Sequence, residues 1–409
     1  MVQLRWWIAA LLAAGCGDHA NKQPTLIDAS VTHDDATIDG PPDASVPVNV
    51  LDTAFATQGK YALGTGVACV AFALDTSDRP ILVSAGPSLP ATLTRFTSAG
   101  VLDPTFGAGG SVYVANGAML NGWTSAFTLA SGKIVVLATF PIDATHYAPH
   151  LYRFTDAGVP DLDVELPITV SSAALIARER ADGDLEVVTT GTAAGRAFAI
   201  VRITAAGVLD ATFGDHGVAV LDTSAYGMSP GYFPHGVAVG DGTFVLSGAS
   251  FGAVGMGTGP INGHLIRVVD GAITAHAETD NAQVFSLALD GTQPIAFVNA
   301  FPDNHGTIEP IDATTLAPDL ANTLAMPFTL EGRYGMFSGA ALAVGSGTDL
   351  IVGEVASGAM MLARYASDAS HASHARSEVT GADGYCGSAI DSHDRPVFAT
   401  QNAIYRFVP

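Results

Sequence analysis

The chain has 409 residues, of which 48% are hydrophobic and 14% are charged, so it can build a large buried core and is too apolar for global disorder. Its formal charge of −22 at pH 7 repels phosphate backbones, and we therefore expect no nucleic acid partner. Only three lysines occur, which excludes a basic patch that would bind a membrane surface.

Residues 1–15 predict a lipoprotein signal peptide. Arg5 precedes ten uncharged residues, which rise about 15 Å as a helix and so reach about half-way across a bilayer core. The ending AAGC resembles the lipobox of bacterial lipoproteins, in which the cysteine receives a diacylglyceryl group and becomes the new N-terminus. This resemblance implies lipidation of Cys16. Ala13 stands where that family prefers leucine, and a plain secreted protein is the alternative.

Residues 16–50 predict a disordered tether behind the lipidated cysteine. The segment 17–50 contains six aspartates, four prolines and one lysine, and it shows no hydrophobic periodicity. Such a segment buries too little apolar surface to offset the entropy lost on ordering. We therefore expect an exported protein, anchored by its lipid in the outer membrane of a bacterial cell envelope.

From residue 51 onward the chain repeats itself. GVLDPTFGAGG (100–110) returns almost unchanged as GVLDATFGDHG (207–217), and hairpin patterns recur with a period of about 53 residues between Asp75 and Asp391. Each unit contains short β-rich runs and no helical periodicity, which is typical of a propeller blade. Stretches that end in arginine and an apolar residue mark the units at 93–96, 151–154, 200–203, 265–268, 362–365 and 404–407.

The repeat predicts an all-β fold over residues 51–409, a seven-bladed β-propeller with six blades as the alternative. Each hairpin would supply the two inner strands of a blade, and the arginine-bearing stretch would supply the third strand. The chain would then begin with a fourth strand and stop after a third strand. The first segment would complete the last blade, which closes the ring and removes an exposed edge.

The duplicated motif predicts structural roles. Its aspartate accepts backbone N–H groups and fixes a turn, its phenylalanine fills space between neighbouring sheets, and its glycines permit positive φ. These residues are Asp103 and Asp210, then Phe55, Phe106 and Phe213, then Gly107, Gly110, Gly214 and Gly217. The copies share no titratable partners of the kind that catalysis needs.

The same letters resemble the Delta-60 repeat, a propeller-type repeat of bacterial surface and secreted proteins. The resemblance is clear at 71–110 and 184–217 and partial at 51–59 and 126–158. It implies a propeller fold and no established activity.

Two cysteines remain once Cys16 is assigned to lipid. Cys69 and Cys386 lie near the start of the first and last inner strands, which a closed ring makes neighbours. An exported protein can oxidise them to a disulfide, and two small buried thiols are the alternative.

No motif in the chain predicts a catalytic residue, a cofactor or a metal ion. The glycine-rich stretch 252–263 lacks the lysine and the following helix of a phosphate-binding loop, and His371 with His374 lacks a third metal ligand. We therefore predict a monomeric, non-catalytic binding or scaffold module whose loops contact a protein, peptide or glycan. The alternative is a propeller enzyme, a metal-assisted hydrolase or lyase with its site at the mouth of the central channel.

Overall fold

The fold is taken from a computed structural model, and its described strands all belong to the unit Val46–Pro409. No helix in that described part is long and apolar enough to cross a membrane. The predicted signal peptide, Cys16 and nearly all of the tether lie outside the described residues. The structure describes residues 50–86, 89–115, 124–141, 147–191, 197–229, 234–251, 261–279, 282–300, 305–321, 323–329, 341–344, 348–355, 359–366, 373–379 and 384–409.

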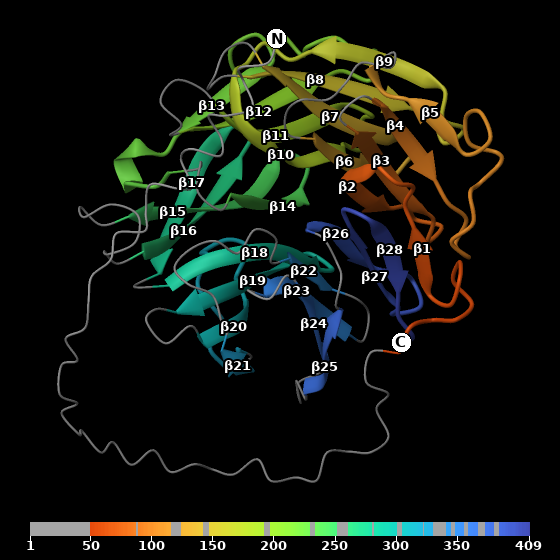
Figure 1. Cartoon of the computed structure of the whole chain (residues 1–409). Helices are drawn as coiled ribbons and strands as arrows, with labels where there is room; N and C mark the ends of the chain where they lie inside the picture. The colour runs from red at the N-terminus through yellow and green to blue at the C-terminus, as the bar shows by residue number, and fades with distance from the viewer. Residues whose placement is uncertain are drawn as a thin grey trace, which may run out of the picture. The chain divides into compact units, whose positions relative to one another are not determined.

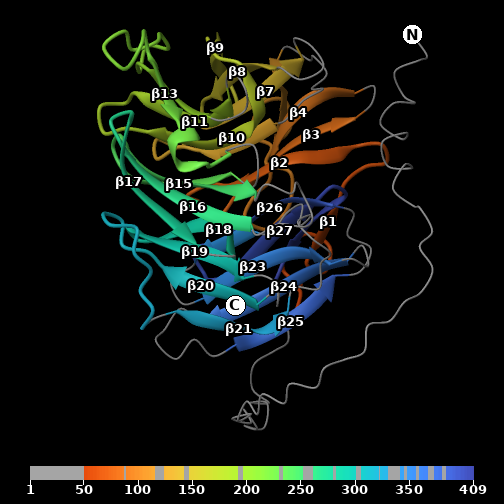
Figure 2. The same ribbon diagram turned by 90° about the vertical axis from the view of Figure 1, so that its left-hand side faces the viewer.

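The described strands form six hydrogen-bonded antiparallel sheets, five with four strands and one with eight. The eight-stranded sheet consists of two sets of four, β6–β9 and β10–β13, which are linked through the single pair Val170–Tyr147. The sheets follow one another around a common centre, as Figures 1 and 2 show from two directions. This arrangement is an all-β propeller, as the repeat predicts.

The first strand of each set lies beside the first strands of its two neighbours, and together these strands form the inside of the ring (Figure 1). They are rich in alanine, glycine and serine, whose small side chains suit the crowded centre. They are β2 (Ala68–Leu74), β6 (Thr124–Thr128), β10 (Val170–Glu179), β14 (His235–Gly240), β18 (Ala282–Asp290), β22 (Ala341–Val344) and β26 (Tyr385–Ile390).

The second and third strands carry most of the core, which lies between neighbouring sheets. One apolar cluster, for example, joins Ile81 and Leu93 of one set to Val136 and Phe154 of the next. The second strands are β3 (Pro80–Gly86), β7 (Ile134–Pro141), β11 (Leu185–Gly191), β15 (Thr243–Phe251), β19 (Gln293–Ala300), β23 (Thr348–Val355) and β27 (Pro396–Thr400). The third strands are β4 (Leu89–Arg95), β8 (Tyr147–Phe154), β12 (Ala197–Ile203), β16 (Ile261–Val269), β20 (His305–Pro310), β24 (Ala359–Ala366) and β28 (Ala403–Arg406).

The fourth strands form the periphery, and the N-terminal strand is one of them. β1 pairs with β28, with Lys60 opposite Tyr405, so the first segment completes the last sheet as predicted. The fourth strands are β5 (Ser111–Tyr113), β9 (Pro160–Glu165), β13 (Val218–Asp222), β17 (Ala272–Thr279), β21 (Leu324–Thr329), β25 (Ser373–Val379) and β1 (Lys60–Ala62).

The duplicated motif joins its own sheet to the following one. Thr105 N donates to Asp103 Oδ1 at 3.0 Å, which fixes the expected turn, and Asp103 Oδ2 accepts from Arg95 Nε at 2.8 Å. The Arg95 guanidinium lies over the ring of Phe106, 4.7 Å from its centroid, and both side chains are almost fully buried. Arg95 also bonds Asp156 in the following sheet, so one arginine fixes both a turn and a sheet–sheet contact.

The arrangement recurs in two other copies. Arg202 and Arg406 lie over Phe213 and Phe55, and each also reaches a turn of the next sheet. The three phenylalanines are buried between sheets and the motif glycines have positive φ, so these predictions are confirmed. The repeated letters alone did not predict these contacts of the arginines.

Candidate functional site

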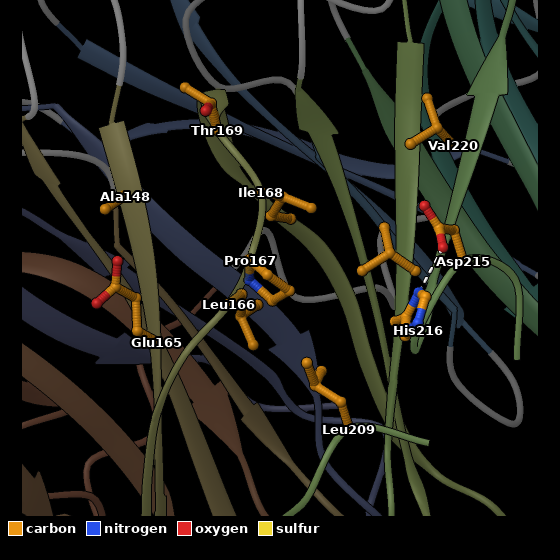
Figure 3. A pocket seen from close by; sticks show the side chains of 11 residues that line it. Ala148, Glu165, Leu166, Pro167, Ile168, Thr169, Leu209, Asp215, His216 and Val220 are labelled. Carbon is orange, nitrogen blue, oxygen red and sulfur yellow. Dashed lines mark hydrogen bonds and ion pairs between the residues drawn. The ribbon is translucent and has the colours of Figure 1, made fainter. Parts of the chain in front are cut away.

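A cleft lies between the two halves of the eight-stranded sheet, next to the outer strands β9 and β13 (Figure 3). Its volume is about 680 Å³, within the range of small-ligand and peptide sites. Its lining residues are Ala148, Glu165, Leu166, Pro167, Ile168, Thr169, Leu209, Asp215, His216, Val218 and Val220.

The floor of the cleft is the short crossover from β9 to β10. Leu166 N donates to Pro149 O at 2.9 Å and Ile168 N donates to Leu166 O at 2.8 Å, so the backbone here is held from both sides. Leu166 is buried, and Ile168 packs against the same apolar cluster. The floor is therefore apolar and fixed before any ligand arrives.

One wall is the turn that leads into β13. Asp215 N donates to Val218 O at 2.7 Å, and His216 adopts a positive φ of 53° within that turn. Val218 and Val220 both line the cleft, and Val220 remains 54% exposed. An apolar ligand group placed here would cover this exposed side chain.

The rim of the cleft is acidic. The carboxylates of Glu165 and Asp215 are 67% and 92% exposed, and His216 Nδ1 lies 2.5 Å from Asp215 Oδ1. The lining residues include no lysine or arginine to balance this charge. The cleft therefore combines an apolar floor with negative charge at its edge.

A second cluster, which we call the serine–histidine relay, consists of Ser250 on β15, His264 on β16 and His276 on β17. Ser250 Oγ lies 2.8 Å from His264 Nε2, and His264 Nδ1 lies 3.0 Å from His276 Nε2. His276 stacks on Tyr226, with ring centroids 4.3 Å apart and an interplanar angle of 24°. Tyr226 belongs to the 3₁₀ turn η2 (Ser224–Tyr226), the crossover from β13 to β14.

Burial sets the protonation of the relay. Burial lowers the pKa of both His264 and His276 below the ordinary histidine value, although the charge of Glu278 opposes this. Glu278 Oε1 accepts from Asn262 Nδ2 at 2.6 Å. Both rings are therefore neutral at pH 7, so His264 can accept a proton.

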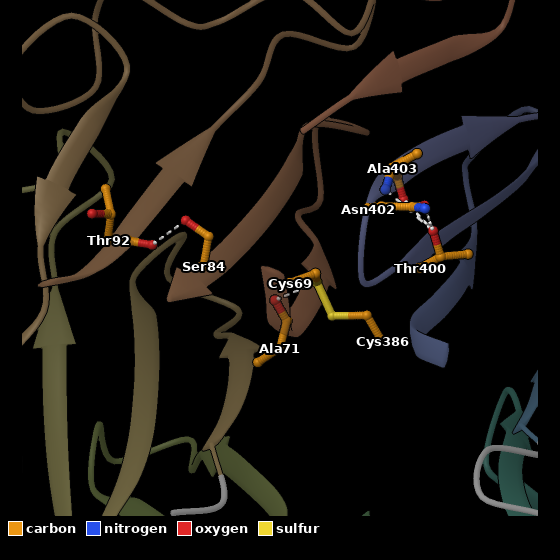
Figure 4. Close-up of a disulfide and its surroundings, with 8 residues drawn as sticks. All are labelled: Cys69, Ala71, Ser84, Thr92, Cys386, Thr400, Asn402 and Ala403. Carbon is orange, nitrogen blue, oxygen red and sulfur yellow. Dashed lines mark hydrogen bonds between the residues drawn. A yellow bond between two sulfur atoms is a disulfide. The ribbon is translucent and has the colours of Figure 1, made fainter. Parts of the chain in front are cut away.

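The ring is closed covalently where the last sheet meets the first. Cys69 and Cys386 form a disulfide, with Cα atoms 6.0 Å apart (Figure 4). Near the same junction, Asp78 Oδ1 accepts from Ser392 N at 2.8 Å and Asp78 Oδ2 accepts from Ser392 Oγ at 2.6 Å. These contacts join the last sheet to the first, whereas the β1–β28 pairing completes the last sheet itself.

Asp78, Asp391 and His393 are near enough to share a metal ion, with one ligand atom from each within 4.8 Å of the others. Their carboxylates already have partners, because Asp391 Oδ1 accepts from His393 N and Arg395 N and Asp391 Oδ2 accepts from Arg395 Nε. The group therefore fits a hydrogen-bonded junction better than a metal site.

The residues singled out from the sequence fall into two groups. Cys16, His371 and most of 252–263 lie outside the described residues, and the side chain of His374 does too. Cys69 and Cys386 are brought together. Sequence reasoning missed both the cleft and the serine–histidine relay. The repeated letters give no signal for the relay, because His264 precedes the arginine-bearing stretch 265–268 and His276 follows it.

Comparison with known proteins supports the fold and nothing finer. No protein family and no curated protein sequence matches the chain. Its structure is similar to the RRP9 WD40 repeats, with a TM-score of 0.52 at 8% identity over 89% of this chain and 100% of that one. It is also similar to a chain of the mitotic checkpoint complex, with a TM-score of 0.50 and 8% sequence identity. That match covers 85% of this chain and 94% of the other chain. The chain is a β-propeller protein.

Proposed function

We propose that this protein is an exported, lipid-anchored propeller that binds an extended segment of another envelope protein in the cleft between β9 and β13. The observation that carries the proposal is the apolar floor with an acidic rim. A peptide with aliphatic side chains flanked by lysine or arginine matches both features, because its apolar groups would cover Val220 and its cations would face Glu165 and Asp215.

The anchor rests on Cys16 and the acidic segment behind it. A lipid on Cys16 and an extended tether would hold the ring away from the outer membrane of a bacterial envelope. The Cys69–Cys386 disulfide supports an oxidising compartment, since such bonds persist in exported proteins. The binding module is monomeric in this proposal.

We also propose that the ring counts seven blades of the Delta-60 type. Each half of the eight-stranded sheet has four antiparallel strands in chain order, and its first strand lies beside those of its neighbours. The arginine, aspartate and phenylalanine of the repeated letters recur in the same contacts around Arg95, Arg202 and Arg406.

Peptide binding is tested by fluorescence anisotropy with a labelled peptide of alternating valine and arginine. The chain should bind this peptide and not a twin with glutamate in place of arginine, and added salt should weaken binding. Val220→Arg should weaken binding about tenfold or more, because it adds a cation to the cleft. Val101→Arg is the matched control, since Val101 is 59% exposed and does not line the cleft. Equal binding of the two peptides would refute the proposal that the cleft binds a cationic peptide.

Anchoring is tested separately by metabolic labelling with a palmitate analogue in a bacterial host. Wild type should incorporate label and Cys16→Ala should not. Absence of label on wild type would refute the lipidation of Cys16. It would not affect the proposal that the cleft binds a peptide.

The alternative proposal is a propeller enzyme with a metal-assisted hydrolase or lyase site at the channel mouth. Three or more histidines or carboxylates converging at that mouth would favour it. The Asp78–Asp391–His393 group instead lies in the turns between first and second strands.

A further inference from the structure

We propose that Ser250 is the nucleophile of a second site, which hydrolyses carboxylic esters, with His264 as the general base and His276 as a positioning residue. This site is separate from the peptide cleft, and neither proposal depends on the other. The carrying observation is the relay of two hydrogen bonds, 2.8 Å and 3.0 Å long, that runs from the hydroxyl of a partly buried serine to two imidazoles.

The strand register makes this arrangement rigid. His264 lies opposite Gly248, two residues before Ser250 on β15, and His276 lies opposite Ile266 on the other side of β16. Directly opposed residues of an antiparallel pair project from the same face, so the three side chains converge on one surface of the sheet. The relay is therefore built on strands, which hold such groups better than loops do.

His264 is more deeply buried than Ser250, as a general base behind a nucleophile should be. His264 is 1% exposed and engaged at both ring nitrogens, so its orientation is fixed. Ser250 is only partly buried, and the proposal requires that a substrate reach its hydroxyl from solvent. A fixed base behind an accessible hydroxyl is the arrangement of a serine hydrolase nucleophile.

The proposal assigns one of the two tautomer sets that the contacts allow. His264 carries its proton on Nδ1 and donates to His276 Nε2, while its Nε2 accepts from the Ser250 hydroxyl. His276 carries its proton on Nδ1, and stacking on Tyr226 holds its ring. In this assignment His276 takes the role that a carboxylate has in the serine–histidine–aspartate triad.

The reaction balances with water as the only co-reactant. Ser250 Oγ bonds to the ester carbonyl carbon while its proton moves to His264 Nε2. The carbon–oxygen bond of the ester breaks, and the leaving alcohol takes that proton. Water then attacks the acyl-serine and gives its proton to His264, which returns it to Ser250 as the acid departs.

Esters are the expected class because the positioning residue is a neutral imidazole. A carboxylate in this place stabilises the imidazolium by its full charge, whereas His276 offers only a dipole and Glu278 acts from an exposed position. Such a base serves a substrate with a good leaving group better than it serves an amide.

The experiment combines covalent labelling with hydrolysis. The purified chain is treated with a fluorophosphonate probe, the labelled residue is found by mass spectrometry, and hydrolysis of p-nitrophenyl butyrate is followed. We expect label on Ser250, and Ser250→Ala should lose the label and about 100-fold or more of the hydrolysis rate. Ser224→Ala is the matched control, an exposed serine nearby that should keep both signals.

His264→Gln tests the base, and its thermal melt shows whether it folds. His276→Asn tests positioning, and it should change the pH profile of hydrolysis as well as lower the rate. Label on another residue, no label on wild type, or full hydrolysis by Ser250→Ala would overturn the proposal even if a histidine variant fails to fold.

Discussion

Arg95 Nη1 lies 2.7 Å from Asp156 Oδ1, so a third strand of one sheet is bonded to a turn of the next. The same guanidinium binds Asp103 in its own sheet and lies over Phe106. Side chains such as this one fix the relative position of neighbouring sheets, together with single backbone hydrogen bonds such as that from Gly107 N to Ala157 O at 2.8 Å.

Arg95→Met should therefore be strongly destabilising. It leaves Asp103, which is only 5% exposed, with Arg79 alone, whose Nη1 lies 3.8 Å from Asp103 Oδ2, and loss of the nearer partner of a buried pair costs about 3–5 kcal/mol. The midpoint of urea unfolding measures the effect. The double variant Arg95→Met with Asp103→Asn should recover part of the loss, and additive losses would contradict the pairing.

Gly100→Ala should destabilise more than Gly109→Ala. Both glycines have positive φ, 77° and 69°, so both substitutions strain the backbone to a similar extent. A Cβ on Gly100 would lie 2.7 Å from Phe55 Cε2, whereas nothing lies within 4 Å of a Cβ on Gly109. The difference between the two melting temperatures measures the effect of the contact between the new Cβ and Phe55. Equal shifts would show that Phe55 moves aside without loss of stability.

Removal of the disulfide should lower stability without preventing folding. Cys69 and Cys386 are 317 residues apart, and closing so long a loop restricts the unfolded chain, with typical values of about 2–4 kcal/mol. Cys69→Ala with Cys386→Ala should melt at a lower temperature than wild type. A reductant should lower the melt of wild type and leave that of the double variant unchanged. A reductant effect on both proteins would point to another cause.

Acid should weaken the fold through His235. Burial lowers the pKa of His235 to about 4, so the folded state keeps this ring neutral where the unfolded chain protonates it. The contribution is complete above the unfolded pKa of about 6.5 and falls as pH drops from there towards 4. His235→Gln should flatten the decline of the urea midpoint between pH 7 and pH 4.5. His216→Asn, at a side chain 90% exposed, should not.

The repeated letters predict most of the architecture. The alternating runs locate the strands, and the short first segment predicts the β1–β28 pairing. Asp103 and Phe106 could be assigned their roles because turn chemistry and an apolar ring act locally or between adjacent units. The resemblance to a repeat family adds the expectation that the sheets form a ring. The hydrogen-bonded sheets of the structure are arranged in such a ring.

The candidate sites depend on the register of paired strands and on the angles between neighbouring sheets. The repeat pattern of the sequence does not predict either. A bulge between Arg267 and Val268 decides which residue of β17 lies beside His264. The cleft forms where the short crossover at Leu166 connects the two halves of the eight-stranded sheet. The partner of Arg95 in the next sheet, Asp156, is fixed by the twist between sheets, and no motif spacing encodes it.

The closure of the ring has a consequence for biogenesis. Asp52 and Arg406 bond at 2.9 Å across a separation of 354 residues and β1 pairs with β28, so β1 has its strand partner only after the ribosome has made nearly all of the described strands. Such a distant pairing makes assembly slow. A circular permutant that joins the present ends and begins between two sheets would convert this last step into a local hairpin, and it should refold faster than the natural order of strands.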